Sequence, residues 1–582
     1  MNDRLARLEA QLDALAREVA AIDERLVALE ARGAAATAVP AGMAIDAAGP
    51  EAARPPSRES DATAVISLVG RTLVVLAGAY LLRALTESGT LAPTAGVAAG
   101  LAYALVWIAM AERAGAAGRR SSAAFHGVAF VFIAFPLVFE RTAPDGPLHV
   151  LGNGAGAAAL GGLAAVSLGA AARRGLPVVA WLTTIGALVT AAGLMLLSGV
   201  VGPYAVYLVL VGVATLWIGY VLDWIALRWP VALVADFAVF VIALRAVGAR
   251  APDTPATALV VQVLLVAAYL GSFAARTLFL NRDVIPFEVM QSIAVIGVGL
   301  GGAAYVTHAT GVGMAPLGVA ALLIGAGAYG VAIAFVERRQ RRRKNFYFYT
   351  TAALVFTMAG CALLLPPAGT ALTWAALAVA AAAAGRRACR VTFDAHSAVY
   401  VAGAAAAGGL LLHAAHGLGL PGATPPHDPG LVAVVVLAAA AACTLALGRA
   451  PERPAWERLP RLALLLVTVG GVMGVATDWL VPPLAQVSES AFDAGIVATL
   501  RTAMLVGGAL TLAWAGGARR FVEAGWLVYP LLTVIGVKFL FEDMRASRPA
   551  TLFVAFALYG AALIVGPRLR RGRATPRQGP EG

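Results

Sequence analysis

Residues 203–222 have the sequence PYAVYLVLVGVATLWIGYVL, an apolar run that contains no charged residue. A helix rises 1.5 Å per residue, so about 20 residues cross the roughly 30 Å hydrocarbon core of a bilayer. Because lipid offers no hydrogen bonds to the backbone, such a segment must be helical. Of the 582 residues, 60% are hydrophobic and 13% are charged, whereas soluble proteins carry about 25% charge. The sequence therefore predicts an all-α, polytopic transmembrane helical bundle.

Apolar runs of this length recur along the chain, separated by short polar stretches. This spacing predicts about 18 spans. The predicted spans are 64–85, 92–111, 122–139, 151–171, 178–198, 203–222, 229–248, 257–275, 285–307, 316–336, 346–365, 370–385, 396–413, 429–447, 461–481, 493–514, 521–541 and 549–566. The range 370–385 is the shortest of them and is poor in large apolar side chains.

The distribution of basic residues predicts the orientation of these spans. With the N-terminus in the cytoplasm, the cytoplasmic loops hold 23 Lys or Arg residues, counting Arg461 at the start of a span, and the loops on the opposite side hold four. Basic loops remain on the cytoplasmic side, so the pattern predicts an even number of spans and two cytoplasmic termini. The net charge of +12 is then explained by the basic residues that keep these loops in the cytoplasm. We expect membrane lipids as partners and no nucleic acid.

The N-terminal residues 1–32 carry Leu, Val or Ile at alternate spacings of three and four, from Leu5 to Leu29. This complete heptad pattern predicts a cytoplasmic coiled coil and a homo-oligomer formed through residues 5–29. Two alternatives remain, which are docking on the protein's own cytoplasmic loops and an amphipathic helix on the membrane surface.

Composition divides the chain into four parts. The stretch after the heptads is rich in Ala, Pro, Gly and Ser, and it cannot bury enough apolar surface to order itself. The predicted parts are a coiled coil at 1–32, a flexible linker at 33–62, a transmembrane helical domain at 63–567 and a basic cytoplasmic tail at 568–582.

Charged side chains at membrane depth cost about 2.5–3.5 kcal/mol each on insertion scales, and therefore mark buried sites or pathways. Several of them fall in the outer half of the predicted spans. We expect these residues to line a polar cavity open to the outer face, and the excess of cations favours an anionic ligand such as a lipid phosphate or a carboxylate. The alternatives are snorkelling to the interface and structural ion pairing. The predicted ligand-binding residues are Arg83, Arg245, Asp478, Arg501, Lys538 and Asp543.

Three histidines, His413, His416 and His427, lie in one predicted outer loop beside Asp428. Loop histidines without a helical or CxxC frame are typically solvated, so we expect no metal site. The sequence contains no Walker phosphate-binding loop, zinc-protease motif or nucleophile elbow. It therefore predicts no catalytic residue and no cofactor.

Short motifs in the first and last spans carry a resemblance to a known family. They are Gly70-Arg71, Leu81-Leu82-Arg83-Ala84, Arg501-Thr502, Gly525-Trp526, Val537-Lys538-Phe539-Leu540 and Asp543. With these motifs, and with its coiled coil, linker and many spans, the chain resembles the bacterial polytopic membrane proteins catalogued as domain of unknown function 2339. The resemblance implies the bacterial inner (cytoplasmic) membrane and no established activity. Between about 115 and 485 the chain matches this family only in hydropathy.

Three functional hypotheses follow from the sequence. The first is membrane transport or the handling of a lipid or anionic ligand at the outer-facing polar site. The second is a non-catalytic membrane scaffold assembled by the coiled coil. The third is a membrane-embedded transferase that uses a lipid-linked donor, for which Asp478 is the best candidate base.

Overall fold

The computed structural model describes residues 58–144, 146, 149–248, 252–340, 343–388, 390–418, 429–446, 454–485, 493–517, 522–546 and 548–571. Every regular element in these ranges is helical, as predicted, and none of them contains a strand. The predicted coiled coil at 1–32 lies outside the described residues. The chain divides into two compact units, Met1–Val74 and Val75–Gly582, and all contacts discussed below belong to the second.

The helices of the N-terminal half are α2 (Arg58–Glu87), α3 (Pro93–Ala116), α4 (Arg120–Thr142), α5 (Asn153–Arg174), α6 (Pro177–Ser198), α7 (Gly202–Val221), η1 (Ile225–Leu227), α8 (Arg228–Arg245), α9 (Pro255–Ala274), η2 (Ala275–Phe279), α10 (Pro286–Val295), η3 (Ile296–Leu300) and α11 (Gly301–Thr310). The first of these, α2, begins inside the range 33–62 that the sequence predicts as a linker.

The helices of the C-terminal half are α12 (Met314–Gly330), η4 (Val331–Gln340), α13 (Arg343–Leu364), α14 (Pro367–Ala388), α15 (Val391–Ala407), α16 (Leu410–Gly417), α17 (Leu431–Ala446), η5 (Ala455–Arg458), α18 (Leu459–Leu484), α19 (Ala494–Gly516), α20 (Ala524–Lys538), η6 (Phe539–Asp543), α21 (Met544–Ala546) and α22 (Pro549–Arg571). Each predicted span overlaps a helix or a run of consecutive helices.

Fifteen helical segments of the described chain are long and apolar enough to cross a membrane, or sixteen if the bent pair α15 and α16 forms one span. Large apolar side chains also cover their outer surfaces; Leu196 is 85% exposed and Phe279 86%. Such a surface suits hydrocarbon rather than water. The all-helical architecture with many helices of membrane-spanning length and polarity is therefore confirmed, while the number 18 remains a prediction. The weak range 370–385 falls in α14, which is among the fifteen.

The predicted span 396–413 is broken in the structure. Gly409 has a φ of +78°, a left-handed conformation that glycine adopts without steric cost. α15 ends just before this point, and α16 continues at an angle of 79°. The break turns a segment that the hydropathy pattern presents as one span into two short helices, and it redirects His413 and His416 on α16.

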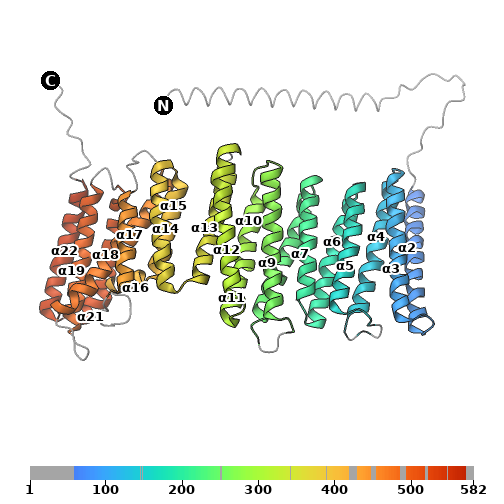
Figure 1. Cartoon of the computed structure of the whole chain (residues 1–582), viewed down its shortest axis with the longest axis horizontal. Coiled ribbons are helices and arrows are strands. Elements are labelled where there is room, and N and C mark those ends of the chain that lie inside the picture. Colours follow the sequence, from blue (N-terminus) through green and yellow to red (C-terminus); the bar gives the residue numbers. More distant parts are fainter. Residues whose placement is uncertain are drawn as a thin grey trace, which may run out of the picture. The chain divides into compact units, whose positions relative to one another are not determined.

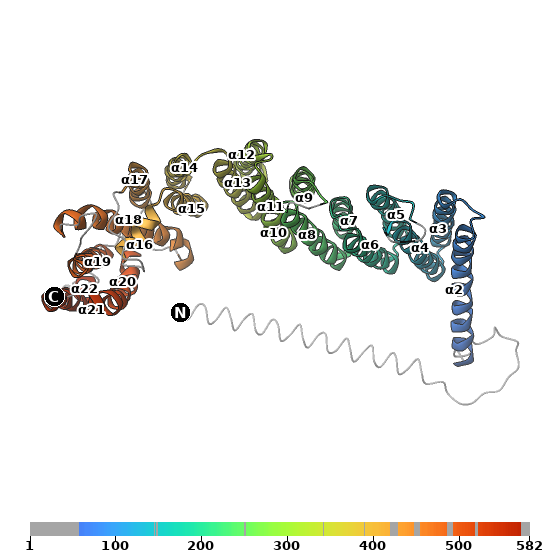
Figure 2. The same cartoon turned by 90° about the horizontal axis from the view of Figure 1, so that it is seen from below.

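Helices of the second unit pack mostly against neighbours in sequence, such as α3 with α4 and α12 with α13 (Figures 1 and 2). Packing between α16 and α18 joins elements that are not consecutive. There the two backbones touch, because a methyl group at Gly474 would overlap the backbone of His413, and one at Gly417 would meet the backbone of Gly474. Only glycine permits so close an approach.

Candidate functional site

Three of the six predicted ligand-binding residues, Arg501, Lys538 and Asp543, come together in one buried cluster on α19, α20 and η6. The ammonium nitrogen of Lys538 lies 2.8 Å from Asp543 Oδ2, 2.9 Å from Thr502 Oγ1 and 3.0 Å from the carbonyl oxygen of Ala498. Thr502 Oγ1 in turn lies 3.1 and 3.0 Å from the two carboxylate oxygens of Asp543. Lys538 thus donates to three partners, so its charge is fully compensated inside the bundle.

Glu542 completes this cluster, although the sequence analysis did not include it in the site. Its Oε1 accepts a hydrogen bond of 3.0 Å from Arg501 Nη1, and its Oε2 lies 3.1 Å from Lys538 Nζ. Two cations therefore face two carboxylates, and the formal charges sum to zero. The side chain of Glu542 is 23% exposed, whereas those of Arg501 and Lys538 are nearly inaccessible. Glu542 is therefore the most accessible of the four charged groups.

One donor of the cluster is unsatisfied. Arg501 Nε is buried and has no hydrogen-bond partner among the described residues. A buried donor left without a partner costs about 1–3 kcal/mol, and more when the group is charged. This atom is therefore a natural contact point for a ligand or a water molecule.

A π-helical turn, η6, explains why Lys538 and Asp543 meet. In an α-helix, residues five apart point about 140° away from one another, at 100° per residue. The wider turn of a π-helix brings such residues to the same side, and these turns are frequent at functional sites. The i,i+4 spacing of an α-helix places Glu542 beside Lys538, but it does not indicate Asp543 as the second partner.

An apolar cavity of about 530 Å³ lies between α17, α18 and α19. On α19 its lining includes Met504, Gly508 and Thr511, one turn and more beyond Arg501 on the same helical face. On α18 the lining includes Met473 and Ala476, whose neighbour Asp478 belongs to a second buried cluster. The charged cluster thus lies at one end of a long apolar space.

Asp478 contacts histidines rather than the cations of the first cluster. Its Oδ2 lies 2.5 Å from His413 Nδ1 and 4.0 Å from His416 Nδ1. Both histidines belong to α16, so their predicted placement in an outer loop is wrong; Gly409 starts a new helix where hydropathy alone indicates the end of a span. His427 and Asp428 lie outside the described residues.

The other two predicted site residues lie elsewhere, and no ion pair within the described ranges joins them to the cluster. Arg83 on α2 is 43% exposed and pairs with Glu87 at 2.8 Å and with Glu140 of α4 at 3.1 Å. It lines a cavity of about 160 Å³ together with the buried Arg141. Arg245 ends α8 and is exposed. The six residues therefore do not form a single cavity.

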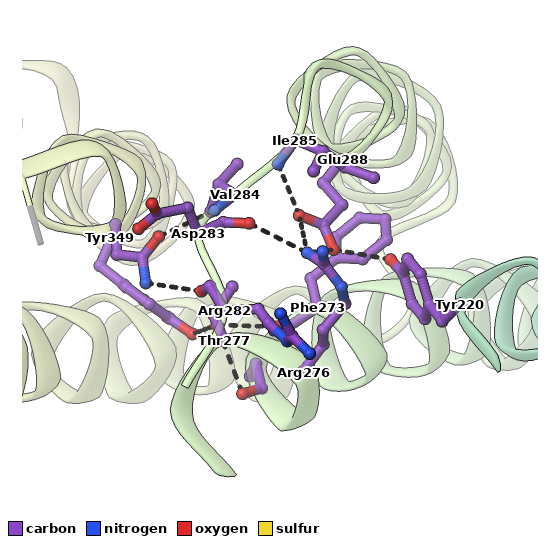
Figure 3. Close-up of polar contacts among 12 residues, drawn as sticks. Tyr220, Phe273, Arg276, Thr277, Arg282, Asp283, Val284, Ile285, Glu288 and Tyr349 are labelled. Carbon is purple, nitrogen blue, oxygen red and sulfur yellow. Dashed lines mark hydrogen bonds and ion pairs between the residues drawn. The ribbon is translucent and has the colours of Figure 1, made fainter. Parts of the chain in front are cut away.

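A further polar cluster, which the sequence analysis did not identify, joins α7, η2, α10 and α13 (Figure 3). Glu288 is fully buried and accepts hydrogen bonds from Tyr220 Oη at 2.6 Å, from Arg276 Nη1 at 3.0 Å and from the backbone amide of Ile285 at 2.9 Å. The side chain of Asn345 binds the same loop, since it accepts from the amide of Val284 and donates to the carbonyl of Arg282.

This Glu288 cluster fixes the loop between η2 and α10. A Glu at the third position of a helix often accepts a hydrogen bond from the backbone amide just before the helix. Glu288 holds this position in α10, so its contact with the amide of Ile285 could be predicted from the sequence. The contacts with Tyr220 and Asn345 depend on tertiary packing. Both carboxylate oxygens of Glu288 accept hydrogen bonds, as buried polar groups normally do in a structural role. The cluster therefore serves to hold the loop against the neighbouring helices.

Glu288→Gln is expected to destabilise the protein by about 2–4 kcal/mol, because Arg276 loses its buried counter-ion and one amide hydrogen faces another donor. Thermal unfolding in detergent measures this change. Glu87→Gln removes one partner of the exposed pair with Arg83 and should change stability little. Equal effects of the two substitutions would contradict the role assigned to Glu288.

Comparison with models of known protein families, with curated proteins and with solved structures found no match. The resemblance to the family catalogued as domain of unknown function 2339 therefore remains a prediction from short motifs. Three of those motifs, Arg501-Thr502, Val537-Lys538-Phe539-Leu540 and Asp543, supply every polar side chain of the first cluster except Glu542.

Proposed function

We propose that this membrane protein transports or otherwise handles an anionic amphiphile, such as a lipid. The anionic group would bind at Arg501 and the hydrocarbon chain would occupy the cavity between α18 and α19. The observation that carries the proposal is the buried, unsatisfied Nε of Arg501, located one helical turn from an apolar cavity of about 530 Å³.

Glu542 would act as an internal competitor for the ligand. It is the most exposed charged group of the cluster, and it accepts a hydrogen bond from Arg501 Nη1. An incoming phosphate or carboxylate can replace it and also accept from Nε, which forms the two-pronged contact that guanidinium groups favour. Displacing Glu542 leaves the Lys538–Asp543 pair intact. That ion pair would continue to hold the helices together while Arg501 exchanges Glu542 for the ligand.

The shape of the site suits a molecule with one polar end. On α18 and α19 the cavity extends from Ala476 and Ala503 to Leu465 and Ala515, about 12 residues of α19, or roughly 18 Å at 1.5 Å per residue. The predicted topology puts the charged cluster toward the outer face and the cavity toward the cytoplasm. We therefore propose an outer-leaflet ligand in the inner membrane of a bacterium, with both termini of the protein cytoplasmic.

Lipid retention tests this proposal. Native mass spectrometry of the detergent-purified chain should show a preference for phosphatidylglycerol over phosphatidylcholine. Arg501→Gln is expected to lower this preference about tenfold or more, because hydrogen bonds to charged groups contribute about 1.5–3 kcal/mol. Glu542→Gln removes the competing charge and should raise the preference. Arg545→Gln, an exposed control on α21, should leave it unchanged.

A scaffold is the second candidate function, and the complete pairing of Lys538 favours it. In that case the charges only fix helix register, and the predicted coiled coil at 5–29 assembles the protomers. Under this hypothesis Arg501→Gln and Glu542→Gln would both reduce thermal stability, and neither would change lipid preference. The transferase hypothesis has less support, because Asp478 is fully buried and hydrogen-bonded to His413.

A further inference from the structure

We infer that His413, His416 and Asp478 form a binding site for one divalent transition-metal ion of the zinc class. This site is separate from the Arg501 cluster and does not depend on the proposed lipid ligand. One potential ligand atom from each of the three residues lies within 4.8 Å of the others. The two histidines are three residues apart on α16, and the aspartate comes from α18.

The three side chains converge on one point from two helices. His413 Nδ1 and His416 Nδ1 lie 2.5 and 4.0 Å from the same carboxylate oxygen, Asp478 Oδ2. In a tetrahedral zinc site, with metal–ligand distances of about 2.0–2.2 Å, neighbouring ligand atoms lie about 3.3–3.5 Å apart. To bind the ion, the ligand atoms would therefore have to shift by about 1 Å, which small side-chain rotations can provide.

The ligand chemistry selects the class of ion. Two imidazoles and one carboxylate form the mixed nitrogen and oxygen set that zinc and its first-row neighbours prefer, whereas magnesium and calcium prefer oxygen ligands alone. To bind the ion, His413 would carry its ring hydrogen on Nε2, so that Nδ1 and Asp478 Oδ2 would both face the metal.

Burial of Asp478 distinguishes this site from an ordinary histidine–aspartate hydrogen bond. The carboxylate is fully buried, and its Oδ1 makes no hydrogen bond within the described part of the chain. A buried carboxylate with an unsatisfied oxygen is costly unless a cation compensates it. A divalent ion would supply that charge and would use the second imidazole, which is 4.0 Å from the carboxylate and too distant for a direct hydrogen bond.

The backbone frame of the site is rigid. Gly474, one turn before Asp478, lies against the backbone of His413, and Gly417 follows His416 and meets Gly474. These two glycines fix the distance between α16 and α18 at the level of the three ligands. The frame matches the general requirement that a metal site be held by well-packed elements.

Cobalt binding to the full-length, detergent-purified chain tests the inference. Co²⁺ in a tetrahedral site absorbs visible light, and titration should saturate at one ion per chain, with release on addition of Zn²⁺. His416→Gln removes one ligand but leaves the His413–Asp478 hydrogen bond, so the fold is preserved. We expect it to weaken binding by about 100-fold or more, since even changes outside the ligand set cost 10–100-fold.

Asp478→Asn and the control His308→Gln complete the experiment. Asp478→Asn should abolish the visible band, and His308→Gln, on an exposed residue of α11, should retain wild-type binding. A wild-type chain that binds no cobalt and holds no zinc on elemental analysis would overturn the inference. So would saturation of the His416→Gln chain at the wild-type concentration of cobalt.

Discussion

Replacing Lys538 with methionine is expected to lower the free energy of unfolding by about 3–5 kcal/mol, the usual result of breaking a buried ion pair by removing one partner. The substitution leaves the fully buried Asp543 without its cation, and it also removes the hydrogen bonds to Thr502 and to the carbonyl of Ala498. Methionine has nearly the same length as lysine, so the loss reflects charge rather than a cavity. Thermal or denaturant unfolding in detergent measures it.

The double variant Lys538→Met/Asp543→Leu separates charge from packing. With both charges removed, an apolar pair occupies the same space, and most of the lost stability should return. Arg545→Gln, just outside the cluster, is the surface control and should have little effect. If the single variant lost less than about 1 kcal/mol, Lys538 would not be the buried partner of Asp543, since breaking such a pair costs several times more.

Gly474→Ala is expected to separate α16 from α18 and to lower stability by about 3 kcal/mol or more, at the upper end of overpacking effects. The added methyl group would overlap the backbone carbon and oxygen of His413 and the amide nitrogen of Ala414. Backbone atoms cannot rotate away as a side chain does, so the helices must move. Circular dichroism during heating measures the loss.

Gly470→Ala is the matched control for this prediction. It lies one turn earlier on the same helix, and a methyl group there would meet only the side chain of Ala414 at 3.6 Å, an ordinary contact. We expect unchanged or slightly raised stability, because alanine favours the helix more than glycine does. Similar losses for both glycines would contradict the proposed backbone contact between α16 and α18.

The sequence predicted the helical, multi-pass architecture because membrane depth imposes a strict length and polarity on each segment. The same logic located Arg501 and Lys538 in the outer half of their spans, with Asp543 just beyond the end of one of them, and these residues do meet. Depth is a property of one helix, and hydropathy is sufficient to estimate it. Packing decides which helices become neighbours, and hydropathy does not show it. For this reason the sequence analysis wrongly placed Arg83 and Arg245 in the same cavity as the other residues.

Local backbone departures account for the other differences. The π-helical turn η6 brings Asp543 to Lys538, and Glu542 then neutralises the site that the sequence analysis expected to be cationic. The break at Gly409 turns a predicted span end and loop into α16, which delivers His413 and His416 to Asp478. Neither departure changes hydropathy, so an analysis of apolar runs and α-helical spacing cannot detect them.

The balance of two cations and two carboxylates around Arg501 has an electrical consequence. The membrane potential exerts no net force on a group of charges that sums to zero, so it does not drive the resting cluster as a whole across the membrane. A single substitution that removes one charge leaves an elementary charge in the field, worth up to about 2.3 kcal/mol per 100 mV across the full membrane. The stability of a cluster altered in this way would then follow the energisation of the cell.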